Sequence, residues 1–240
     1  MATRIDLRQA AWLAALFGIV VSGCSGLTTV NGTDSSAFLP SMRVAWDVGS
    51  STASPASASS SQPHDGRAME LFVAHGSGDS TQNLSAGQDP IRFGGVTFNA
   101  PLAIREQFEF SLVALSFRWR KFFNNFGLEL LGGGGYGSLD ATLDAGAQRG
   151  RENPGRLHAQ GAFGVIGNLT ASTSLQARGT IGLSSRFSFG RSEAVVVQAI
   201  GKNAAVRAGW AWWNWNDNLT SGSDIHFKLS GPTLGLDLEF

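Results

Sequence analysis

The feature that most constrains the fold of this chain is an alternation of apolar and polar residues with a period of two. It is clearest in the last segment, 234–240 (LGLDLEF), where four apolar side chains alternate with a glycine and two carboxylates. Similar segments of about ten residues recur from residue 67 onward and are interrupted by glycines. Because successive side chains of a strand point to opposite faces, and because glycine weakens long helices, this pattern predicts β-strands and argues against a helical bundle.

Composition indicates where these strands lie. Charged residues make up 15% of the chain, against roughly 25% in typical soluble domains. The 18 basic residues balance the 18 acidic ones, which excludes a strongly basic nucleic-acid-binding protein. A chain of strands with apolar faces and little charge suits a lipid environment, where strands must close so that no backbone group is left unpaired. We therefore predict an all-β fold, a closed antiparallel transmembrane β-barrel.

The alternation is compatible with two numbers of strands, eight or ten. Alternation places one strand at 67–77, and the remaining seven follow it. An alternative with ten strands adds 42–50 and 91–99, and eight is the preferred number. In the last strand the apolar parity changes at Gly231–Pro232, where we expect a β-bulge. The seven further strands are expected at 105–120, 126–140, 157–167, 172–185, 193–201, 204–216 and 225–240.

The N-terminal segment is typical of a targeting signal. Arg4 and Arg8 precede an apolar run at 10–21, which leads into Ser22-Gly23-Cys24. This layout predicts a secretory signal peptide over 1–23. The end of the run also resembles the lipobox of bacterial lipoproteins, which implies cleavage before Cys24 and lipidation of that cysteine; the alternative is an ordinary signal peptide followed by a bystander thiol.

The rest of the chain then divides into two parts. Residues 24–66 are expected to form a lipidated flexible tether, with 42–50 left open as an extra strand, and 67–240 the barrel. A soluble β-sandwich or lipocalin-like barrel stays open as an alternative.

Short turns are expected on one side of the barrel, at 121–125, 167–171 and 202–203, and longer loops on the other, at 78–104, 141–156, 185–192 and 216–224. In this loop asymmetry, in its strand pattern and in its terminal Phe240, the barrel part resembles the small opacity-type outer-membrane barrels of bacteria. The resemblance implies a monomer in the bacterial outer membrane that contacts outer-membrane lipid. It also implies recognition of the Phe240 end by the barrel-assembly machinery. The function expected from it is non-enzymatic, namely to present surface loops and support the envelope. A narrow conduit or binding barrel for a small amphiphile is a further alternative.

Strand parity also predicts where polar and aromatic side chains point. The narrow interior of an eight-stranded barrel can be filled by side chains, so inward charges are expected to form a plug of ion pairs. Tryptophans on the opposite parity are expected at the membrane interfaces. The inward set comprises Glu129, Arg178, Arg207, Asp237 and Glu239, and the interface set comprises Trp119, Trp210 and Trp212.

One arrangement carries a chemical hypothesis. His75 and Ser77 share one face of a predicted strand, and a histidine beside a serine is the minimum for nucleophilic acyl chemistry. The pair resembles the His-x-Ser motif of outer-membrane lipid A deacylases, which implies Ser77 as nucleophile and His75 as base. No orienting carboxylate can be assigned from the sequence, and two polar residues at a strand end are the alternative. The four histidines have no metal-ligand spacing, so we expect no metal and no cofactor.

Overall fold

The computed structural model describes residues 29–36, 38–48, 65–218 and 224–240, and every regular element in these ranges is a β-strand. None of the described residues forms a helix of the length and apolarity needed to cross a membrane. Nine strands form a ring: β2 (Ser41–Asp47), β3 (Gly66–Leu84), β6 (Leu102–Phe123), β7 (Phe126–Ala145), β9 (Gly155–Asn168), β10 (Thr173–Leu183), β11 (Phe187–Ala199), β12 (Ala204–Asn218) and β13 (Asp224–Glu239). Four further strands lie outside it: β1 (Thr29–Ser36), β4 (Ile91–Phe93), β5 (Val96–Phe98) and β8 (Gln148–Glu152).

Eight strands of the ring, from β3 to β13, pair antiparallel with their neighbours in chain order. The ninth strand, β2, closes the ring because it pairs antiparallel with β3 and parallel with β13. Each of the eight predicted segments overlaps a different ring strand, but the predicted number is one too low and the closure is not wholly antiparallel. The segment 42–50, left open by the sequence, contributes β2, whereas 91–99 forms the separate hairpin β4–β5.

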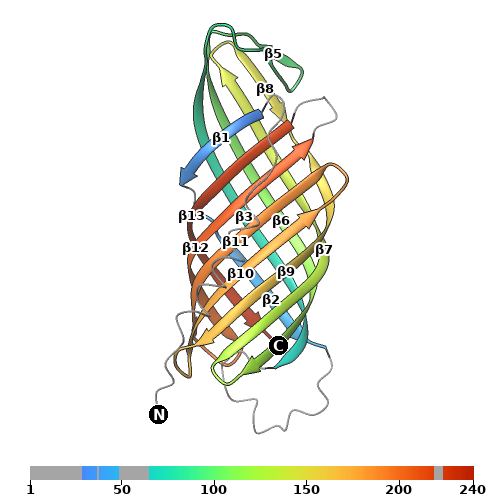
Figure 1. The fold of residues 1–240 in the computed structure, drawn as a ribbon, viewed down its shortest axis with the longest axis vertical. Helices are drawn as coiled ribbons and strands as arrows, with labels where there is room; N and C mark the ends of the chain where they lie inside the picture. Colours follow the sequence, from blue (N-terminus) through green and yellow to red (C-terminus); the bar gives the residue numbers. More distant parts are fainter. Residues whose placement is uncertain (1–28, 37, 49–64, 219–223) are drawn as a thin grey trace, which may run out of the picture.

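The two ends of the ring differ (Figure 1). The turn end carries the short connections 124–125, 169–172 and 200–203 together with the C-terminus. The hairpin end carries β4, β5 and β8, and β8 pairs with the extended end of β7. Much of the segment predicted as an outer loop, 78–104, is therefore strand, because β3 continues to Leu84 and pairs with β6 up to that residue.

The polarity of the ring reverses along its axis. In the half near the turn end the outward side chains are mostly apolar, and many of the inward ones are charged. Near the hairpin end, β12 instead turns Asn214 and Asn216 outward and buries Trp213 and Trp215. We call the outward apolar surface the apolar band; its ring-strand segments are 42–46, 69–73, 113–119, 128–136, 157–165, 175–183, 194–196, 206–212 and 234–238.

This reversal explains the parity change in the last strand. The pairing of β13 with β12 runs from Asp224 to Leu238 without a register shift, so the bulge expected at Gly231–Pro232 is wrong. Phe227 and Leu229 are buried in the interior, whereas Leu234 and Leu236 lie on the outer surface. One regular strand passes between two environments, and the apolar residues change sides where it does.

Candidate functional site

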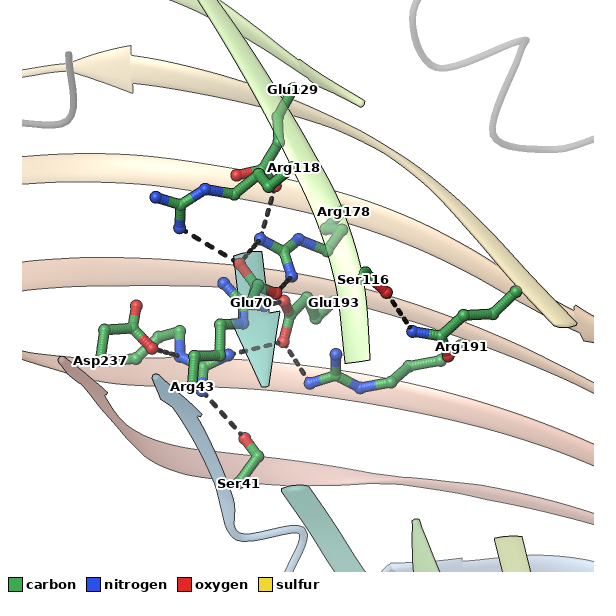
Figure 2. A network of polar contacts seen from close by, with 12 residues as sticks. Ser41, Arg43, Glu70, Ser116, Arg118, Glu129, Arg178, Arg191, Glu193 and Asp237 are labelled. Carbon is green, nitrogen blue, oxygen red and sulfur yellow. Dashed lines mark hydrogen bonds and ion pairs between the residues drawn. The ribbon is translucent and has the colours of Figure 1, made fainter. Parts of the chain in front are cut away.

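The interior of the ring near the turn end holds a group of charged side chains, which we call the ionic cluster (Figure 2). It contains six arginines and five carboxylates, and every ring strand except β9 contributes to it. Most of these side chains are almost fully buried. The members are Arg43, Glu70, Arg118, Arg120, Glu129, Arg178, Arg191, Glu193, Arg207, Asp237 and Glu239.

Arg178 joins two carboxylates on one side of the cluster. Its Nη1 lies 2.6 Å from Glu70 Oε1, and its Nη2 lies 2.5 Å from Glu129 Oε1. Arg118 Nη1 also reaches Glu70, at 3.2 Å, and Arg120 Nε donates to Glu129 at 2.6 Å. Strands that are far apart in the chain are thus joined across the interior by charge-assisted hydrogen bonds.

Glu193 is the centre of the other side. Its carboxylate pairs with Arg43, with Arg191 at 2.5 Å and with Arg207 at 3.4 Å. Arg207 Nε lies a further 3.0 Å from Asp237 Oδ1. Unpaired buried charges are very costly, so these contacts explain how the interior tolerates so many ionised groups.

All five side chains predicted to point inward belong to the ionic cluster. Six other members were not predicted, although alternation contained a signal for some of them. Glu70 lies between outward Met69 and Leu71, and Arg43 lies between outward Met42 and Val44. The parity that placed those strands therefore also placed the two charged residues inside.

The hairpin end of the interior is filled by aromatic side chains instead. Phe187 packs on Trp215 with ring centroids 4.4 Å apart, and Phe110 packs on Trp213 at 4.8 Å. His158 is buried against Phe189 in an edge-on contact at 5.1 Å. The ionic cluster thus lies in the part of the interior near the turn end, and this aromatic cluster in the part near the hairpin end.

The tryptophans predicted for the membrane interfaces lie on the outer surface. Trp210 and Trp212 are 42% and 46% exposed, and Trp119 is half-buried on the outward parity of β6. Trp212 comes directly before the outward asparagines of β12, at one border of the apolar band, and Trp119 lies near the turn end.

The outer surface also carries a polar group around His75. His75 and Ser77 point outward from β3, as their shared parity requires, but the hydrogen bond of His75 is with a different serine. His75 Nδ1 lies 3.2 Å from Ser111 Oγ on β6, and His75 Nε2 lies 3.9 Å from Glu109 Oε1. Ser77 is the register partner of Glu109. Neither β6 residue could be assigned from the sequence, because alternation does not reveal the register between two strands.

Cys24, the predicted lipidation site, lies outside the described residues. No group of three or more His, Cys, Asp or Glu side chains suited to hold a metal ion occurs in the described part of the chain.

These observations define a class of structure: an all-β protein whose nine-stranded ring encloses paired charges at one end and aromatic rings at the other. Comparisons of the chain with protein-family models, with curated proteins and with solved structures found no match.

Proposed function

We propose that this chain is a β-barrel protein of a bacterial outer membrane. In this proposal the apolar band faces lipid, and the hairpin end stands clear of the membrane and presents its surface to the surroundings. We assign the interior of the ring no catalytic role, because ion pairs and aromatic rings occupy its two ends. The same side chains obstruct passage through the ring, which disfavours the alternative role as a conduit.

The observation that carries the proposal is the reversal of polarity along the ring. A soluble protein buries apolar side chains and exposes charged ones, and the hairpin end follows that rule. The turn-end half does the opposite, since it buries an ionic cluster while Leu130, Phe163 and Leu175 are each 40% exposed or more. Water would strongly disfavour such a surface, whereas lipid favours it.

The length of the band agrees with this role. A tilted strand needs about 9–11 residues to cross the hydrocarbon core of a bilayer. The apolar band covers 157–165 on β9 and 175–183 on β10, which is close to that length. Strands β3, β6 and β12 continue past the band at the hairpin end, where outward residues such as Asp79, Gln107 and Asn214 are polar.

The predicted lipid anchor and signal peptide belong to the same proposal. Secretion through a signal peptide at 1–23 would deliver the chain to the envelope, and a lipid on Cys24 would add an anchor to the membrane-embedded ring. Recognition of the Phe240 end by the assembly machinery would account for insertion.

The test is a matched pair of arginine substitutions on the outer surface. Leu130→Arg places a charge within the apolar band, where an outward arginine costs up to about 2–4 kcal/mol at the bilayer midplane and less toward the interface. Gln107→Arg makes the same kind of change on the polar outer surface of the hairpin end and should cost little. Both variants and the parent chain are expressed in full, and outer-membrane fractions are analysed on gels before and after boiling.

The expected result is a heat-modifiable band in the outer-membrane fraction for the parent and for Gln107→Arg, and a marked loss of that band for Leu130→Arg. A parent chain that stays in the periplasmic soluble fraction without a heat shift, or a Leu130→Arg variant that behaves like its control, would refute the proposal.

A further inference from the structure

The polar group around His75 lies where the outer surface changes from apolar to polar. The register of β3 with β6 pairs Val73 with Val113, then His75 with Ser111, and then Ser77 with Glu109. These pairs are successive outward-facing rows of one surface, because alternate residues of a strand share a face. The His75–Ser111 row is thus the first polar row above the apolar band.

Three side chains in these rows have the relative positions of a nucleophile, a base and an orienting acid. Ser111 Oγ lies 3.2 Å from His75 Nδ1, within hydrogen-bonding reach. The other ring nitrogen, Nε2, lies 3.9 Å from Glu109 Oε1, a distance that a small side-chain rotation can shorten. The side chains of His75 and Glu109 are 46% and 65% exposed, so a substrate can reach the group from outside. Nucleophilic sites are recognised by this geometry rather than by position in the chain.

We propose that Ser111, His75 and Glu109 form a hydrolase site for acyl esters of membrane lipids. The site rests on the proposed function, because the membrane is what brings the ester group to this row. An acyl chain that lies along Val73 and Val113 places its ester carbonyl at the boundary between hydrocarbon and headgroups, which is the level of Ser111. Amphiphiles with an ester one step above their hydrocarbon part are therefore the substrate class.

The reaction follows the two steps of acyl transfer. Ser111 Oγ attacks the carbonyl carbon while its proton passes to His75 Nδ1, and the proton on Nε2 faces the Glu109 carboxylate. The ester C–O bond breaks, and the leaving alcohol takes the proton from His75. Water then attacks the acyl group on Ser111, gives a proton to His75, and releases the carboxylic acid as the proton returns to Ser111.

A hydroxyl is also available to stabilise the tetrahedral intermediate. The register of β6 with β7 pairs Ser111 with Ser138 on the same outward face, where opposite Cβ atoms lie about 5 Å apart. Donation from Ser138 to the developing oxyanion would supply the electrostatic term on which such reactions depend.

The experiment uses the full chain reconstituted in phosphatidylcholine vesicles that contain a fluorogenic acyl ester, with a short soluble ester measured in parallel. A fluorophosphonate probe, which reacts with activated serines, is applied to the same samples, and the labelled peptide is identified by mass spectrometry. Ser111→Ala is expected to abolish the label and the turnover, and His75→Ala to lower turnover by roughly 10²–10⁴-fold. Ser77→Ala is the matched control, since it removes a serine from the same face and should keep both.

Vesicle flotation and the heat-modified gel band are recorded for every variant, so that failure to enter the membrane is separated from failure of the site. Labelling of Ser111 and cleavage of the soluble ester by a chain that does not float would support the site and refute the membrane proposal. A floating, folded parent chain with no label on Ser111 and no ester cleavage would overturn the site. Loss of turnover in Ser77→Ala with retention in Ser111→Ala would overturn it as well.

Discussion

Glu193 offers the sharpest test of how the ionic cluster stabilises the ring. Its carboxylate pairs with Arg43, Arg191 and Arg207, and its side chain is 1% exposed. The change Glu193→Gln keeps the shape of the side chain but removes its charge. Three buried guanidinium groups then share less negative charge, in a cluster that already has one more arginine than carboxylates.

The cost follows from the burial of all four groups. Removing one partner of a buried ion pair typically costs about 3–5 kcal/mol, because the remaining charge stays buried without compensation. Relaxation of the arginines and water entry would reduce this value toward its lower end, so we expect a loss of about 3 kcal/mol. The control is Asp79→Asn, which breaks the ion pair with Arg105, where both side chains are about 60% exposed. That pair should be worth about 1 kcal/mol or less.

Urea unfolding in lipid vesicles, followed by tryptophan fluorescence, measures both free energies. The double variant Arg43→Met with Glu193→Gln should recover part of the loss, because it removes one of the unmatched cations. A loss below 1 kcal/mol for Glu193→Gln, or a loss equal to that of Asp79→Asn, would refute the view that these contacts hold the interior together.

Three further predictions concern other parts of the chain. Burial raises the pKa of Glu106, which accepts a hydrogen bond from Ser80 near the hairpin end. The free energy of unfolding should therefore fall as pH rises above the unfolded-state pKa of about 4.3. In urea unfolding, Glu106→Gln should be more stable than the parent at pH 8 but not at pH 4. A Cβ on Gly133 would lie 2.1 Å from the Leu115 carbonyl oxygen, whereas one on Gly132 meets nothing within 4 Å. Gly133→Ala should therefore lower the free energy of unfolding by about 1–3 kcal/mol, and Gly132→Ala should leave it nearly unchanged. Equal losses in the two variants would contradict this. β1 begins at Thr29 beside Asp224 at the hairpin end, and the five residues from Cys24 to Thr29 span at most about 17 Å when extended. A lipid on Cys24 should therefore enter the membrane from the side on which the hairpin end lies. Protease sites inserted after residues 26 and 146 should then be cut from the same side of the membrane.

Much of the fold followed from local patterns. Alternation placed each of the eight antiparallel strands, because the period of two is a property of the strand backbone itself. It also assigned Glu129, Arg178 and Arg207 to the interior, together with the two carboxylates of the last strand. The outward direction of His75 and Ser77 followed from the same parity.

Other features depended on contacts that are distant in the chain. β2 enters the ring because Met42 pairs with Leu236 and with Val73, and no pattern within 42–50 specifies those partners. Ser111 and Glu109 reach His75 only through the register of β6 on β3. Ser77 was predicted as the nucleophile from the pattern of one strand, in which the hydrogen bond between His75 and Ser111 of the neighbouring strand cannot be seen.

The sequence by itself determined which residues share a face and where eight of the ring strands lie, since both are consequences of local backbone geometry and turn chemistry. It did not determine how far β3 and β7 extend toward the hairpin end, where they reach Leu84 and Ala145. Only the tertiary structure decided that one face of a strand stays inside along the whole ring, past the change from charged to apolar side chains. The same parity of β6 carries Phe110 in the aromatic half and Arg118 in the ionic half, so the inward charges near the turn end did not by themselves predict that the apolar residues of that parity are inside as well. Closure of the ring places both side chains inside, because every residue of that parity must then face the interior, whether its side chain is apolar or charged.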